Sequence, residues 1–157
     1  MAGTKLEPRD PDWEAKVRES FARQTFMHLI GGRISALSPG RCEIELLFRA
    51  DLCQQHGFLH GGVVTAIAAN AAGYAAFSLM PAGSSVLGVE YKVNLLGAAE
   101  GEHFIARGNV IKAGRTLSVV ECDVEAIRDG KPRAVARMLT TMMCMEGLPD
   151  LAAKAKP

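Results

Sequence analysis

The stretch from Gly61 to Val89 contains no charged residue, and it begins directly after His60. Up to Met80 it is mostly alanine and glycine, which is typical of a helix covered on most sides by protein. Its 20 residues would span a bilayer on length alone, but the hydrophobicity is weak and no basic cluster flanks it. We therefore expect a buried central helix over about residues 61–80 and no membrane span.

An amphipathic helix is expected before this region. Trp13, Val17 and Phe21 recur at four-residue spacing, so one helix over about residues 11–27 is predicted. Gly31-Gly32 would end it.

Six segments read as strands because they alternate apolar and polar residues or lie between turn signals. They span residues 33–37, 41–49, 86–95, 102–112, 117–128 and 133–145. The last four follow one another through short turns, which favours antiparallel pairing and an α+β fold. A strongly curved antiparallel sheet wrapped around the central helix would cover that helix economically. We expect one domain over residues 1–157, with a folded core at about 33–145 and a tail at 148–157.

Composition limits the classes of partner. The 157 residues carry a net charge of +1, which gives no electrostatic case for nucleic acid or an anionic membrane. The four cysteines show no metal-ligand spacing, so no metal is expected. Scattered thiols without a secretory signal at the N-terminus favour a reduced, cytoplasmic protein.

Four segments in order carry a family resemblance. They are Gln55-His56-Gly57-Phe58-Leu59-His60-Gly61-Gly62, Ala72-Gly73-Tyr74-Ala75-Ala76, Val89-Glu90-Tyr91-Lys92-Val93-Asn94-Leu95-Leu96 and Lys112-Ala113-Gly114-Arg115-Thr116-Leu117. With them the chain resembles the hotdog-fold acyl-CoA thioesterases of the phenylacetate-pathway (PaaI-like) branch, from about Arg33 to Met145. The resemblance implies a hydrolase that releases CoA from an acyl-CoA, with no cofactor apart from the coenzyme A of the substrate.

The resemblance also implies roles for residues around the helix start. The Gly61 amide would polarise the thioester carbonyl, which agrees with the unpaired N–H groups and positive dipole end of a helix N-terminus. Gln54 would help to place the attacking water or the carbonyl, and His60 would shape the turn. The residues expected to contact the substrate are Gly62, Asn70, Gly73 and His56, and for Asn70 helix–helix pairing across a dimer interface is an equal alternative.

One expected catalytic group is missing. The family places an Asp or Glu nine residues after the histidine, as nucleophile or as base for water, and here that residue is Ala69. Gln54 precedes it by the family's 15 residues, so the alignment is not shifted. Three interpretations follow: a substituted variant of an ordinary thioesterase, a natural non-catalytic acyl-CoA binding protein, or an enzyme with another base. Candidates for that base are His56, Asp51 or a residue of a partner subunit.

The resemblance extends to coenzyme A and to assembly. The turn at Lys112, Gly114, Arg115 and Thr116 would lie near the CoA phosphates, where an arginine can pair bidentately. Related proteins join two sheets edge to edge into a homodimer, and dimers can pair into a homotetramer. The active sites would then lie between subunits. Acyl-CoA and a second copy of the chain are thus the expected partners.

Overall fold

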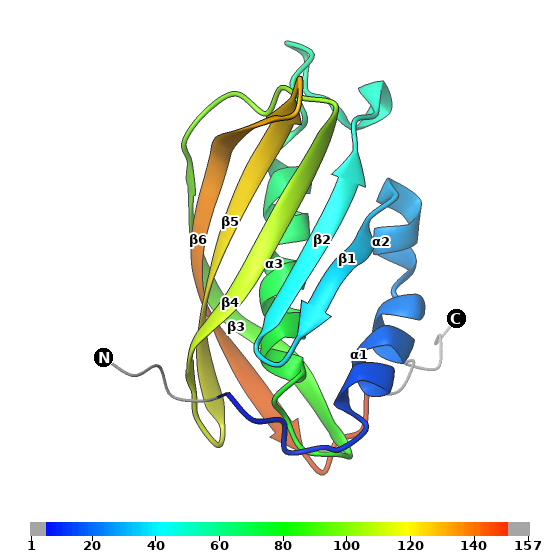
Figure 1. Ribbon diagram of the computed structural model, residues 1–157, viewed down its shortest axis with the longest axis vertical. Helices are drawn as coiled ribbons and strands as arrows, with labels where there is room; N and C mark the ends of the chain where they lie inside the picture. Colours follow the sequence, from blue (N-terminus) through cyan, green and yellow to red (C-terminus); the bar gives the residue numbers. More distant parts are fainter. Residues whose placement is uncertain (1–5, 151–157) are drawn as a thin grey trace.

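A six-stranded antiparallel sheet dominates the computed structural model, which describes residues 6–150. The strand order is β1-β2-β4-β5-β6-β3. The strands are β1 (Arg33–Ser38), β2 (Arg41–Leu47), β3 (Ser84–Leu95), β4 (His103–Ala113), β5 (Leu117–Arg128) and β6 (Lys131–Glu146). Figure 1 shows the sheet curving around a long helix, α3 (Gly61–Phe77). The expected α+β class and the curved antiparallel sheet around a central helix are confirmed.

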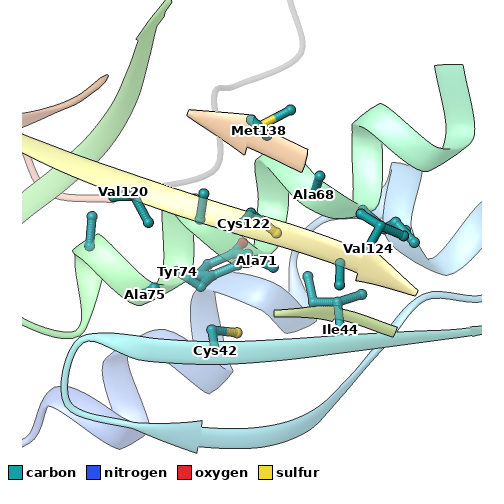
Figure 2. Close-up of a cluster of buried hydrophobic side chains, with 14 of the residues drawn as sticks. Cys42, Ile44, Ala68, Ala71, Tyr74, Ala75, Val120, Cys122, Val124 and Met138 are labelled. Atoms are coloured by element: carbon teal, nitrogen blue, oxygen red, sulfur yellow. The ribbon is translucent and has the colours of Figure 1, made fainter. Parts of the chain in front are cut away.

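The core fills the space between the sheet and α3. In β2, β4, β5 and β6 every second side chain is buried, so one face of the sheet packs on the helix. One row in register runs across five strands: Cys42, Gly108, Cys122, Met138 and Val93. Figure 2 shows side chains of this inner face lying against alanines of α3.

The helix α3 is buried on most of its surface but not all. Nine of its residues are buried. Its remaining face carries mainly small residues, which are half-buried or exposed: Gly62, Thr65, Ala66, Ala69, Asn70 and Gly73. This open face of α3 lies beside the candidate site described below. The helix ends at Phe77 rather than at the expected Met80, because the Leu79 and Met80 amides bond three residues back, in single turns.

The predicted single helix over 11–27 is wrong. The structure has two helices there, α1 (Trp13–Ala22) and α2 (Thr25–Ile30), at the β1 side of the sheet (Figure 1). Phe21 and Met27 are both buried, yet in one continuous helix they would point about 120° apart. A break at Arg23-Gln24 reorients the chain, so that both can reach the core.

Smaller differences concern strand ends. The second strand stops at Leu47 instead of residue 49, and the third begins at Ser84 instead of residue 86. The last strand extends over 131–146. Of the expected tail at 148–157, residues 151–157 lie outside the described residues. No helix within residues 6–150 is long and apolar enough to cross a membrane.

A buried ion pair joins Asp10 to Lys16 of α1, and Lys16 also contacts the segment that follows α3. Asp10 is 5% exposed; its carboxylate accepts the Asp12 N–H at 2.9 Å and pairs with Lys16 at 3.1 Å. The Lys16 ammonium also donates to the Met80 carbonyl at 2.7 Å. Burial alone would raise the pKa of Asp10, but the Asp12 amide and Lys16 together lower it below its usual 3.8.

Asp10→Asn is therefore expected to destabilise the fold in a pH-dependent way. Because the folded pKa lies below the unfolded one, the stabilisation is present above the unfolded pKa and is lost as pH falls through the folded pKa. At pH 7 the variant should lose about 1–3 kcal/mol of unfolding free energy, measured by urea unfolding, and the loss should shrink towards pH 3. Glu14→Gln, which removes an exposed pair with Arg18, should cost less than about 0.5 kcal/mol. Equal losses for the two variants would contradict the assignment.

Candidate functional site

The N-terminus of α3 presents one free backbone donor. His60 is the N-cap, and its Nδ1 accepts the Gly62 N–H at 2.8 Å. The Val63 and Val64 amides both donate to the His60 carbonyl. Of the first four amides of the helix, only that of Gly61 has no acceptor within residues 6–150. Caps normally satisfy these amides, so a remaining one at the positive end of a 17-residue helix is suited to bind an oxygen of a ligand.

A glycine is the residue that keeps this donor accessible. A Cβ on Gly61 would stand 3.1 Å from Leu95 Cδ1 and would occupy part of the space in front of the amide. A carbonyl oxygen could approach the N–H without that obstruction. Negative charge that develops on such an oxygen would be stabilised there by the amide and the helix dipole.

The loop before α3 folds back on itself and holds the polar side chains expected from sequence. A bridge pairs Cys53 with Leu59, and the Gln54 N–H donates to the Phe58 carbonyl at 2.9 Å. Gly57, at φ +83°, forms the tip. The Gln54 side-chain oxygen accepts the His56 N–H, so the Gln54 amide nitrogen can donate to a ligand or to water. Gln54, His56, His60 and Gly61 thus belong to one loop and helix start.

A cavity of about 520 Å³ lies farther along α3 and contains the other predicted positions. Ala69, Asn70 and Gly73 line it from the helix, while Tyr91 and Met142 line it from β3 and β6. Gly61, Gln54 and His60 do not line it. Ala69 lies eight residues beyond Gly61, which is a rise of about 12 Å along a helix. One protomer therefore does not bring the two halves of the predicted site together.

No carboxylate stands in for the missing one at this cavity. Glu90 lines the cavity, but its carboxylate accepts the Thr141 hydroxyl at 2.6 Å. Thr141 follows the buried Thr140, so it belongs to the outer face of the sheet. Asp150 also lines the cavity and is paired with Arg23 at 2.9 Å.

The alternative bases named from sequence lie at the other end of the site. Asp51 is exposed and hydrogen-bonded to Arg49, which lowers the pKa of its carboxyl and makes it a weaker base. His56 is exposed in the loop before α3. Neither residue lines the cavity that contains Ala69.

A second cavity, of about 570 Å³, lies at the C-terminal end of α3. Its walls include Leu79 and Met80, which follow α3, and also Lys112, Gly114 and Arg115. Thr116 does not line it and instead accepts the Cys144 N–H with its backbone carbonyl at 2.8 Å. This cavity and Gly61 thus lie at opposite ends of α3 within one protomer.

Sequence reasoning missed several residues at these two cavities. Ser20, Gln24 and Tyr74 line the first one, and Arg9 lines the second. The spacing of Tyr74, four residues after Asn70, was a usable signal, because such residues share a helix face. Nothing in the spacing of Arg9, Ser20 or Gln24 pointed to α3. Within residues 6–150 no three His, Cys, Asp or Glu side chains gather as metal ligands.

Comparison with known proteins identifies relatives of this architecture. A family model described as the thioesterase superfamily matches residues 56–132. A protein of Saccharolobus solfataricus, named "Putative esterase SSO2140", is 30% identical over 104 residues, which cover 66% of this chain and 73% of that protein. A thioesterase family protein from Silicibacter pomeroyi has a crystal structure with 50% identity and a TM-score of 0.85, covering 86% of this chain and 99% of that one. The Escherichia coli PaaI protein from the phenylacetic acid degradation operon is 16% identical with a TM-score of 0.78, covering 89% and 98% of the two chains, and so shares the fold.

Proposed function

Since the chain belongs to the thioesterase superfamily, we propose that it acts on acyl-CoA thioesters and hydrolyses them to a free acid and CoA. The observation that carries the proposal is the unpaired Gly61 N–H at the start of α3. A thioester carbonyl accepts one strong hydrogen bond there, and its oxygen gains negative charge when water attacks. The arrangement thus favours the transition state over the ground state.

Three residues of the loop and helix start have distinct tasks in this proposal. The Gly61 amide binds the carbonyl oxygen. His60 stabilises the turn, because its Nδ1 accepts a hydrogen bond from the neighbouring Gly62 N–H. The Gln54 amide nitrogen donates to the attacking water or the carbonyl. Gly62 and His56 border this end of the substrate, and no cofactor is required beyond the CoA of the substrate.

A second copy of the chain completes the site in this proposal. Within residues 6–150, β3 is a sheet edge that pairs with β6 alone, and it exposes Leu87, Tyr91 and Leu95 by more than half. Edge strands of this length normally pair or are covered. Antiparallel pairing of two β3 strands would turn the second copy end for end beside the open face of α3. Gly61 of the partner subunit would then approach Ala69 across a homodimer, and two such dimers would pair into a homotetramer.

The two cavities then receive the two halves of the substrate. The cavity beside Ala69, Asn70 and Gly73 takes the acyl group. The second cavity takes the phosphates of CoA, because Lys112, Arg115 and Arg9 bring cationic side chains to it. End-for-end pairing would bring this cavity to the same end of the dimer as Gly61 of the partner subunit. Gly114 keeps the turn tight: a Cβ there would stand 2.4 Å from the Leu117 carbonyl oxygen.

A second candidate function rests on Ala69. The position from which a carboxylate would activate water carries a methyl group, and the cavity's two carboxylates are engaged with Thr141 and Arg23. These features favour a non-catalytic acyl-CoA binding protein on the same fold. Both functions use Gly61 as the carbonyl donor, and they differ in whether CoA is released.

A comparison of Gly61→Pro with Gly61→Ala tests the proposal. Both variants add the Cβ that approaches Leu95, but only proline removes the N–H, and proline is well tolerated at the first position of a helix. His60, at φ −60° and ψ 135°, already has the backbone that precedes proline. In assays of CoA release from acyl-CoAs, Gly61→Pro should be about a hundredfold slower than Gly61→Ala.

The rates of the two variants distinguish the hydrolase from the binding protein and test the role of the Gly61 amide. Equal rates in the two variants would refute the role of the Gly61 amide. Absence of CoA release from the unaltered chain, with acyl-CoA binding that Gly61→Pro weakens, would favour the binding protein. A circular dichroism spectrum and a melting temperature for each variant control for loss of the fold.

We place the protein in the cytoplasm, as the sequence suggested. In support, Cys42, Cys53, Cys122 and Cys144 are all free thiols. Burial raises the pKa of the Cys42 thiol to about 12, so it stays protonated and unreactive.

A further inference from the structure

The acyl cavity, which Ala69, Asn70 and Gly73 line, has a polar end to which residues before α2 contribute. Ser20, at the end of α1, and Gln24, in the break before α2, both reach the Tyr74 hydroxyl of α3. Gln24 Nε2 donates to that oxygen at 3.1 Å, and Ser20 Oγ lies 3.4 Å from it. Tyr74 is 5% exposed and Ser20 is 9% exposed, so this cluster is held in place by packing.

The cluster offers both a donor and an acceptor to a ligand. The Tyr74 oxygen accepts from Gln24, and when the Ser20 hydroxyl also donates to it, the Tyr74 proton is available to a ligand acceptor. Burial is the largest influence on the pKa of Tyr74 and raises it, which keeps the hydroxyl protonated. The Gln24 amide retains its oxygen as an acceptor. Asn70 donates its own amide to the Ala66 carbonyl at 2.9 Å, which leaves its oxygen for the same cavity.

The charges around the cavity favour a neutral ligand group. Arg23 is the cationic residue of its lining, and its guanidinium bonds both the carboxylate and the backbone carbonyl of Asp150. A carboxylate at the end of an acyl chain would have to displace Asp150 and would be repelled by it. A hydroxyl both donates and accepts hydrogen bonds, so it can bind without displacing Asp150 from Arg23.

Two glycines keep the middle of the cavity open. Gly73 on α3 and Gly88 on β3 both line it, and neither has a positive φ. A Cβ on either would meet only Met142, at 4.0 and 3.8 Å, which is ordinary contact. Neither the backbone conformation nor close packing therefore requires glycine at these two positions. Because both residues lack a side chain, they leave space for an acyl chain.

On the basis of the proposed function, we propose that this cavity selects acyl groups with a neutral hydrogen-bonding group, such as a hydroxyl, at the end distant from the thioester, and that Tyr74 and Gln24 recognise that group. Gly73 and Gly88 leave room for the chain that joins the two ends. The N-terminal helices are then part of the specificity of the site.

Binding of non-hydrolysable analogues tests this recognition whether or not the chain turns over. The probes are S-(2-oxoalkyl)-CoA compounds of four, six and eight carbons, each with and without a terminal hydroxyl, titrated by calorimetry. At the chain length that reaches Tyr74, the hydroxylated member should bind about tenfold more tightly than its partner. Tyr74→Phe and Gln24→Leu should each reduce this ratio to less than about threefold while leaving the affinity for the plain analogue nearly unchanged.

Ser35→Ala is the control. Ser35 is an exposed hydroxyl residue of β1 that does not line the cavity, so loss of its hydroxyl should leave the ratio unchanged. Equal binding of both members of every pair by the unaltered chain would overturn the inference and leave the proposed function standing. A preference that survives in both Tyr74→Phe and Gln24→Leu would also overturn it. Failure of every analogue to bind would refute the proposed function and this inference together.

Discussion

Ala69→Asp is expected to raise the rate of CoA release by about 10²- to 10⁴-fold. Ala69 lines the acyl cavity, and it is the position that the resemblance assigns to the missing carboxylate. The cavity's existing carboxylates are engaged elsewhere, Glu90 with Thr141 and Asp150 with Arg23. In the proposed site, a carboxylate on the open face of α3 would supply a base for water, or a nucleophile, beside the carbonyl that a Gly61 amide binds. The half-buried position leaves room for the added atoms.

The measurement is steady-state CoA release from a panel of acyl-CoAs, across pH. Ala69→Asn is the matched control, because asparagine has nearly the same size as aspartate but no basic carboxylate. The Asp variant should lose its added activity as pH falls through the pKa of its carboxylate. The Asn variant should release CoA no faster than the unaltered chain at any pH. Vigorous release by the unaltered chain, with no gain in Ala69→Asp, would mean that another group is the base. If neither chain released CoA but both bound acyl-CoA tightly, the protein would be an acyl-CoA binding protein without hydrolase activity.

Much of the fold could be predicted because local pattern and global structure agree. The alternation of Cys42, Ile44 and Leu46 with polar residues identified a half-buried strand, and all three are at most 1% exposed. The uncharged stretch after Gly61 predicted the central helix, since an uncharged helix must be covered on most sides. The resemblance to hotdog-fold thioesterases is likewise confirmed by the relatives of this chain.

The features that escaped prediction depend on contacts between distant segments. The break between α1 and α2 follows from where Phe21 and Met27 must meet the core, which no local spacing specifies. Gln24 reaches Tyr74 across 50 residues of sequence, and Arg9 reaches the Leu79 carbonyl across 70. The positions Gly61 and Ala69 could be found from sequence, but the cavity that Ala69 lines and Gly61 does not line needed the structure.

The sheet and α3 approach each other closely at Gly108. This residue lies in register between Cys42 and Cys122, in the middle of the inner face. A Cβ built on it would stand 2.5 Å from the Ala71 carbonyl oxygen, 2.6 Å from the Ala71 carbonyl carbon and 2.7 Å from the Ala72 nitrogen. All three are backbone atoms of a buried helix, so no side chain can rotate away to make room.

Gly108→Ala is therefore expected to destabilise the protein by about 3 kcal/mol or more, because the sheet and α3 must move apart around a single methyl group. In a chain of this size that loss lowers the melting temperature by about 10 °C. Gly73→Ala is the control: its Cβ would meet only the Met142 methyl at 4.0 Å, and alanine favours a helix, so stability should be unchanged or rise by up to about 1 kcal/mol. Urea and thermal unfolding of both variants measure the difference. If the Gly108→Ala protein were as stable as the unaltered chain, α3 would not pack directly on the sheet backbone at this point. The position of α3 relative to the sheet, including its open face beside β3, would then have to be revised.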